Sequence, residues 1–274
     1  MDTITSLLAR ELGRDEGHVA NVVQLIDEGN TIPFISRYRK EATGSLNDEV
    51  LRNLHERLTY LRGLEDKKNQ VLGSIQEQGK LTEELKAQIL AAETLVAVDD
   101  LYRPYRPKRR TRATIAKEKG LDGLADVIRL QLTKKPLEKE AVAYLSEEKG
   151  VLTTADAIAG AGDILAEAIS DEADYRSYIR KATLDEGQLL SEAKDEKAQT
   201  VYEMYYHYEE PVKKAAGHRI LALNRGEAEK VLTVRVEAPE ERILRYLEKK
   251  VIVRDNPHTT PVLKMVIADS YSRL

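Results

Sequence analysis

The stretch VDDLYRPYRPKRRTRATIAKEKG, from Val98 to Gly120, separates two regions of helical hydrophobic periodicity. It gathers positive charge and proline, whereas the flanking regions repeat leucine among polar residues. Pro104 and Pro107 lack an amide donor and push the arginine before each of them toward extended dihedral angles. The stretch therefore predicts a stiff, exposed or groove-lying connector, after which a helix resumes near Thr114.

The basic residues of this connector predict a surface that faces phosphates. Clustered guanidinium groups with tyrosines between them suit a nucleic-acid backbone and its unstacked bases. Alternatively, the arginines pair with acidic helices of the same chain, and Asp99 and Asp100 are candidate partners or caps of a following turn. The candidate nucleic-acid-binding residues of the connector are Arg103, Arg106, Lys108, Arg109, Arg110 and Arg112.

A second basic cluster lies in NTIPFISRYRKEATGSL, residues 30–46, after two short helices predicted at Thr3–Leu12 and Asp15–Glu28. Here an apolar plug that includes Phe34 precedes three cations. The functional interpretation is an auxiliary phosphate surface, and the alternative is a buried loop anchor with solvated arginines. The candidate nucleic-acid-binding residues of this cluster are Arg37, Arg39 and Lys40.

Helical patterns fill most of the remaining chain. Residues Asn47–Val98 predict a helical hairpin whose long first arm ends at Gly79, with the leucine stripe as core. After the connector, four short helices separated by Gly, Pro or Asp predict a helix-turn-helix-like bundle. They are expected at Leu121–Leu132, Leu137–Lys149, Thr153–Ser170 and Glu172–Ala182. The AGAG at Ala159–Gly162 lacks the lysine of a phosphate loop and predicts close helix packing.

The C-terminal part mixes helices with short strands. We expect helices at Glu192–Lys214, which carries a tyrosine group, at His218–Arg225 and at Pro239–Lys250, and strands at Lys230–Glu237 and Val251–Arg254. The fold class is therefore mainly α, a multi-helix scaffold with a helix-turn-helix-like insert and one or two short β-strands near the C-terminus. The expected domains are 1–118, 119–191 and 192–274.

The composition excludes several classes of function. Without cysteine the chain has no disulfide or thiolate chemistry, and without an apolar run of about 20 residues it has no membrane span, so we expect a cytoplasmic location. The five histidines are scattered, and no metal or catalytic spacing occurs. We therefore expect no cofactor, no metal site and no enzymatic activity.

Charge is distributed unevenly along the chain. The whole chain has a net charge of -4, but residues 138–210 carry 18 acids and 7 bases. The helix expected at Thr153–Ser170 contains no Arg, Lys, Asn or Gln, the residue types that read base edges. It carries Asp156, Asp163 and Glu167 instead. This helix is therefore predicted to serve in packing or protein docking and not in reading a DNA sequence.

The chain resembles the bacterial Tex family of transcription accessory proteins. The matching stretches are NTIPFISRYRKEATGSL, VDDLYRPYRPKRRTRATIAKEKGLDGLADVI, GAGDILAEAISDEADYRSYIR, YYHYEEPVKKAAGHRILALNRGE and DSYSRL. Arg103, where an apolar residue is commoner, and Gly217, where serine is usual, depart from the family pattern.

The resemblance implies an N-terminal portion that precedes a ribonuclease H-like domain, a helix-hairpin-helix element and an S1 RNA-binding domain. It implies a non-enzymatic scaffold that associates, weakly when alone, with RNA or DNA. The alternative is a module that docks to proteins of the transcription machinery. A further expectation is an uncovered apolar stripe near the C-terminus, formed by Val262, Leu263, Met265, Val266 and Ile267.

Overall fold

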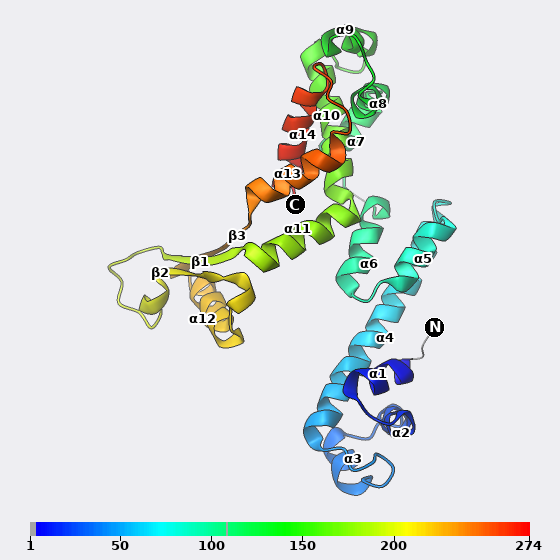
Figure 1. Ribbon diagram of the computed structural model, residues 1–274, viewed down its shortest axis with the longest axis vertical. Coiled ribbons are helices and arrows are strands. Elements are labelled where there is room, and N and C mark those ends of the chain that lie inside the picture. Colours follow the sequence, from blue (N-terminus) through cyan, green and yellow to red (C-terminus); the bar gives the residue numbers. More distant parts are fainter. Residues whose placement is uncertain (1–3, 108) are drawn as a thin grey trace. The chain divides into compact units, whose positions relative to one another are not determined.

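The computed structural model describes residues 4–107 and 109–274, and the fold is mainly α, as predicted (Figure 1). The chain forms two compact units, Met1–Tyr102 (unit 1) and Arg103–Leu274 (unit 2). The expected boundary at residue 118 lies inside unit 2, because the helix just before it packs within that unit. The division into three domains stays a prediction. No helix of the described residues is long and apolar enough to cross a membrane.

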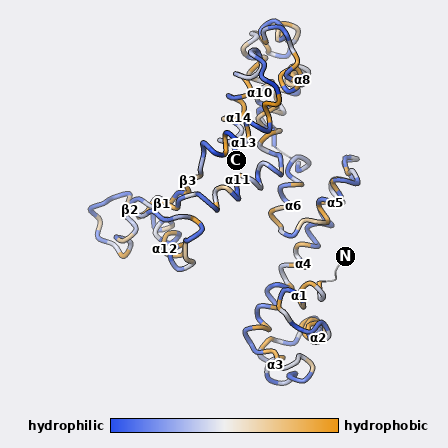
Figure 2. Tube along the Cα trace, viewed as in Figure 1, coloured by the Kyte–Doolittle hydropathy of each residue, from blue (hydrophilic) through white to orange (hydrophobic). Residues whose placement is uncertain are grey.

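Unit 1 is built on one long helix, α4 (Asp48–Glu77), which begins at its predicted cap, where the Asn47 side chain accepts a hydrogen bond from the Val50 amide. Hydrophobic residues recur along α4 among hydrophilic ones (Figure 2). Its first half packs on α1 (Ile4–Leu12), α2 (Glu16–Asp27) and α3 (Ile32–Tyr38). The core between these helices contains Leu8, Val19, Val22, Ile35, Leu51, Leu54, Leu58 and Leu61.

The second half of α4 packs on α5 (Glu83–Ala91) and α6 (Leu95–Tyr102). The predicted hairpin is confirmed for α4 and α5, but its second arm breaks after Ala91 and restarts as α6. The first residues of the predicted connector therefore belong to a helix. Arg103, expected to be extended, begins the 3-10 turn η1 (Arg103–Tyr105) at the start of unit 2.

Unit 2 is organised around α10 (Thr154–Asp171), the helix predicted at Thr153–Ser170. It begins with a capping box in which Thr153 and Asp156 each bond the other's backbone amide. Four helices pack on it: α7 (Arg112–Glu118), α8 (Asp122–Leu130), α9 (Leu137–Ala141) and α14 (Thr260–Ser272). Nine of the 18 residues of α10 are buried, so half of the helix contributes to the core of unit 2.

The AGAG of α10 packs closely against its neighbours, as predicted. A Cβ added at Gly160 would collide with the Leu121 side chain, and one added at Gly162 would lie 3.2 Å from Val266 Cγ2. Leu263, Val266 and Ile267 are buried in the same core. The expectation of an uncovered apolar stripe was therefore wrong for these three residues, because α14 turns them toward α10.

An antiparallel three-stranded sheet follows α11 (Ala173–Glu186), with strand order β2-β1-β3. The strands are β1 (Gln188–Ala193), β2 (His207–Pro211) and β3 (Leu232–Glu237), and only β3 was predicted. Tyr202, Tyr205 and Tyr206 form a small core together with Leu223 of α12 (Gly217–Ala228). The prediction of a helix at Glu192–Lys214 was wrong. Tyr205 and Tyr206 follow Tyr202 by three and four residues, and this spacing is also typical of one face of a helix.

The strand expected at Val251–Arg254 was also wrong. Helix α13 (Glu240–Val251) occupies its first residue, and the Gln131 side chain takes the backbone groups that a neighbouring strand would use. Gln131 Nε2 donates to the Val251 carbonyl at 2.9 Å, and Gln131 Oε1 accepts from the Arg254 amide at 3.0 Å. The segment is thus held by a side chain from α8's C-terminus.

Candidate nucleic-acid interface

The basic cluster of unit 1 is carried by α3 and the turn that follows it. Pro33 lies in the first turn of α3, where its missing amide donor costs no hydrogen bond, and Ile35 anchors the helix in the core. The turn is closed by the Ser45 amide, which donates to the Lys40 carbonyl at 2.8 Å. Arg37, Arg39 and Lys40 are exposed, and none has an ion pair within the described residues.

Two aromatic rings lie on the same surface as these cations. Phe34 and Tyr38 are 36% and 66% exposed, their ring centroids lie 5.2 Å apart, and the Arg39 guanidinium carbon lies 5.5 Å from the Phe34 centroid. Ile35 is buried as expected for the apolar plug, but Phe34 faces solvent. The sequence pattern alone did not predict this pair, because no helix was expected here and only a helix places residues four apart on one face.

The basic connector opens unit 2, and its first arginine is internally paired. Arg103 Nε donates to Asp171 Oδ1 at 3.0 Å, and the Asp171 side chain, at the end of α10, is only 8% exposed. Further along, Arg110 bonds Glu118 Oε2 at 2.7 Å, but both side chains are more than half exposed. An exposed pair of this kind contributes little to stability.

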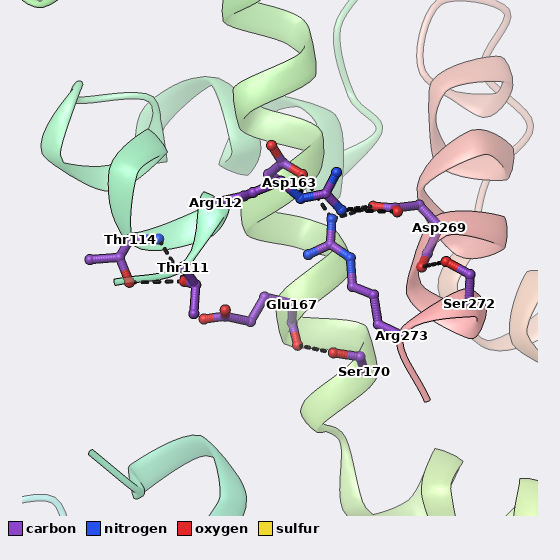
Figure 3. Close-up of polar contacts among 9 residues, drawn as sticks. All are labelled: Thr111, Arg112, Thr114, Asp163, Glu167, Ser170, Asp269, Ser272 and Arg273. Atoms are coloured by element: carbon purple, nitrogen blue, oxygen red, sulfur yellow. Dashed lines mark hydrogen bonds and ion pairs between the residues drawn. The ribbon is translucent and has the colours of Figure 1, made fainter. Parts of the chain in front are cut away.

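Arg112 belongs to a four-residue network with two carboxylates and a second arginine (Figure 3). Its Nε lies 3.3 Å from Asp163 Oδ1, and its terminal nitrogen lies 3.1 Å from Asp269 Oδ1. Arg273 contacts the same two carboxylates and lies 2.8 Å from Asp163 Oδ1. The network joins the start of α7 to α10 and α14.

The network also sets the ionisation of Asp269. Burial disfavours the charged form of Asp269, but hydrogen bonds from Arg273 and Arg112 outweigh this effect and lower its pKa below the ordinary value. The Arg273 pKa is raised, because its bonds to Asp269 and Asp163 outweigh the cost of burial. Arg112 is therefore part of a structural ion-pair network.

The internal-pairing interpretation is confirmed for part of the connector, and the phosphate-facing interpretation stays a prediction for the rest. The internal ion pairs apply to Arg103, Arg110 and Arg112, with partners on α7, α10 and α14. Arg106 and Arg109 are exposed and make no ion pair with any described residue. Lys108 lies outside the described residues.

One of the two acidic partners suggested for the connector, Asp99, is corrected. Asp99 pairs within unit 1 with Lys67, whose Nζ lies 2.9 Å from Asp99 Oδ1. Asp100 is buried in α6. Helix α6 directs the Asp99 side chain toward α4 of unit 1, whereas an irregular connector would have left it near the arginines that follow.

Comparison with known proteins adds a family context. Residues 2–76 match the Tex-like protein N-terminal domain, and residues 132–259 match the Tex central region-like family. The basic connector lies between these two matched segments.

Three relatives illustrate the range of similarity. The protein YdcI of Bacillus subtilis is 46% identical over 97% of this chain and 38% of its own length. The transcriptional accessory protein Tex of Neisseria gonorrhoeae is 43% identical over 84% of this chain and 30% of its own. The human S1 RNA-binding domain-containing protein 1 is 32% identical over 79% of this chain and 22% of its own. The chain thus spans between 22% and 38% of the lengths of these three relatives.

Proposed function

Because this chain belongs to the Tex family, we propose that it is a non-enzymatic helical scaffold that contributes nucleic-acid contacts to a transcription accessory protein. Two relatives have names that point the same way, one as a transcriptional accessory protein and one as an S1 RNA-binding domain-containing protein. RNA or DNA is the proposed partner. No cofactor is part of the proposal.

The observation that carries the proposal is the set of exposed cations that the rest of the described chain leaves unpaired. Ion pairs hold many arginines of this protein, including Arg52, Arg57, Arg62 and Arg129, whereas several of the candidate residues have none. Unpaired cations can bind phosphates without first breaking an internal bond, and binding releases the counterions condensed on the nucleic acid. Among the candidate residues, those without an ion pair to any described residue are Arg37, Arg39 and Lys40 in unit 1, and Arg106 and Arg109 in unit 2.

The proposal is tested by titrating the chain with single-stranded and double-stranded RNA and DNA at several salt concentrations. We expect the logarithm of the association constant to fall linearly with the logarithm of salt concentration, with a slope set by the number of phosphates contacted. An absence of binding to all four nucleic acids at low salt would contradict the proposal.

Charge-reversed variants locate the contacts. Arg37→Glu with Lys40→Glu, and separately Arg106→Glu with Arg109→Glu, should weaken binding and reduce the salt slope. The matched control is Arg52→Glu with Arg129→Glu, which changes the net charge by the same amount at two arginines that are exposed but already paired. Equal losses in the variants and the control would show that only net charge matters.

The connector allows one further test. Arg109→Glu with Arg110→Glu should weaken nucleic-acid binding and leave helicity and melting temperature unchanged, because both side chains are exposed. Unchanged binding would make the segment only a connector. Unfolding would instead show that the Arg110 pair with Glu118 supports the fold.

Protein docking is the second candidate, and one groove in unit 2 favours it. The groove has a volume of about 460 Å³ and lies between α10 and α14, where Ile158, Val262 and Met265 line it. Met265 is 65% exposed. Docking to a protein of the transcription machinery would lack the steep salt dependence that phosphate contacts produce, so the same titrations distinguish the candidates.

The non-enzymatic part of the proposal rests on the chemistry of the side chains. Within the described residues, no three His, Asp or Glu side chains gather into a possible metal site. The buried carboxylates of the connector region are bonded to arginines, which suits a structural role. Incubation of labelled RNA and DNA with the chain and divalent cations should leave both uncut.

A further inference from the structure

We propose that Phe34 and Tyr38 form a stacking platform for unpaired bases, so that unit 1 prefers single-stranded nucleic acid. This inference rests on the proposed function and adds the ligand class and the residues that select it. The platform is the exposed surface of α3 formed by the two rings and the cations Arg37, Arg39 and Lys40.

The first argument is the exposure of the rings. Phe34 is the only phenylalanine of the chain, yet it is 36% exposed, and Tyr38 is 66% exposed. Aromatic rings usually contribute to a core, as Tyr202, Tyr205 and Tyr206 do in unit 2. Tyr38 above all leaves ring area in contact with water, and this area can take a planar ligand.

The second argument is that the platform is already ordered. Ile35, which is fully buried, anchors α3 between the two rings, and the following turn is held to α2 by a bond of 2.8 Å from Asn21 Nδ2 to the Ala42 carbonyl. The ring centroids are 5.2 Å apart with the planes inclined by 45°. A base stacking here orders few new groups, so little of the stacking energy is lost to entropy.

The third argument is the charge around the rings. The segment from Thr31 to Leu46 contains three cations and one acid, Glu41. The Arg39 guanidinium lies over Phe34, 5.5 Å from the ring centroid, and guanidinium groups also stack on bases. Aromatic rings among unpaired cations match a strand whose phosphates are charged and whose bases are unstacked.

A duplex offers this surface only its phosphates. Its bases are stacked on one another, so the rings would gain no base contact unless the duplex opened. The cations therefore bind either form, whereas the rings select the single strand. An acidic protein surface would engage the cations equally well, and this alternative becomes an outcome of the test.

The absence of tryptophan from the sequence makes a direct test possible. In Tyr38→Trp, the introduced indole is the sole one, and a base stacked on it quenches its fluorescence. We expect added oligouridine or oligothymidine to quench the emission. The degree of quenching should follow the fraction of protein bound, which anisotropy measures independently. A duplex with the same number of phosphates should bind without quenching.

Variants that do not carry the introduced tryptophan measure how much each ring contributes to nucleic-acid affinity. Tyr38→Leu, which keeps apolar area but removes the ring, should lower single-strand affinity about tenfold and leave duplex affinity unchanged within about twofold. Phe34→Leu should act in the same direction. Tyr38→Phe keeps the ring and should keep single-strand affinity, while circular dichroism confirms that helicity is preserved in each variant.

Three other outcomes would each overturn the inference, and the measurements distinguish them from one another. If oligonucleotides bind but neither quench the indole nor respond to Tyr38→Leu, the platform is wrong and the proposed function stands. If polyglutamate quenches the indole and oligonucleotides do not, the surface takes an acidic protein. If the unsubstituted chain binds no nucleic acid, both the platform and the proposed function fail.

Discussion

Arg112 and Arg273 share two carboxylate partners but differ in their surroundings. The Arg112 side chain is 62% exposed, whereas that of Arg273 is 20% exposed. Water can replace Arg112 as a partner of Asp163 and Asp269. It has less access to the side of the carboxylates that Arg273 covers, so the two arginines should differ in their contribution to stability.

Substitution of the two arginines should reveal this difference. We expect Arg273→Met to destabilise the chain by about 3 kcal/mol, because it leaves two partly buried carboxylates without their main partner. Arg112→Ala should cost less than about 1 kcal/mol, because its pairs are solvent-screened. Urea unfolding monitored by circular dichroism measures both, and equal losses would contradict this account.

Asp269 should make part of the stability depend on pH. Its pKa is lowered in the folded protein, so the stability it contributes is present above the unfolded-state pKa and is lost as the pH falls through the folded-state pKa. The loss should therefore occur below about pH 4. Melting temperatures of the unsubstituted chain and Asp269→Asn should differ at neutral pH and converge in acid. A constant difference across this range would exclude the ion pair as the cause.

At the scale of the elements, α10 depends on a glycine for its contact with Leu121. Gly160→Val should destabilise the chain by about 1–3 kcal/mol, because the added methyl groups overpack a buried contact. Gly63→Val in α4 is the matched control, since nothing lies within 4 Å of a Cβ at that position. This control should change stability by less than about 0.5 kcal/mol, since glycine and valine have similar helix propensities. Unfolding by urea compares the two variants.

The burial of α10 also bears on DNA recognition. A recognition helix must enter the major groove with exposed polar side chains, whereas α10 is surrounded by α7, α8, α9 and α14 and lacks those residue types. Selection from a random duplex library with the whole chain should therefore enrich no sequence. A defined enriched sequence would show that another element of the chain reads bases.

At the scale of the whole molecule, we expect a protease to cut first in the segment that opens unit 2, just after the boundary between the two units. Residues Arg106 to Arg110 have neither helix nor strand where they are described, and Arg109 and Arg110 are exposed. Limited trypsin digestion should cleave first after Arg109 or Arg110, because proline blocks cleavage after Arg103 and Arg106. Mass spectrometry would then find two resistant fragments, and a first cut inside α4 or α10 would contradict the prediction.

The sequence by itself determined the mainly α fold and the family. The leucine stripe of α4 and the cap residues Asn47, Thr82 and Thr153 are local signals, because a cap bonds an amide two or three residues away. The close packing at Gly160 was also readable, because small residues in a helix leave room for a neighbour. The exposed basic residues of both clusters were named from their sequence alone.

Only the tertiary structure decided which arginines are paired and which elements form the sheet. Arg103 and Asp171 are 68 residues apart, and Arg112 and Asp269 are 157 apart, so no local pattern joins them. Strand β1 exists because β2 and β3 supply its backbone partners, and Val251–Arg254 is no strand because Gln131 takes the groups that pairing needs. Ion pairs and strand ladders depend on proximity in space, whereas helices close their hydrogen bonds within one turn.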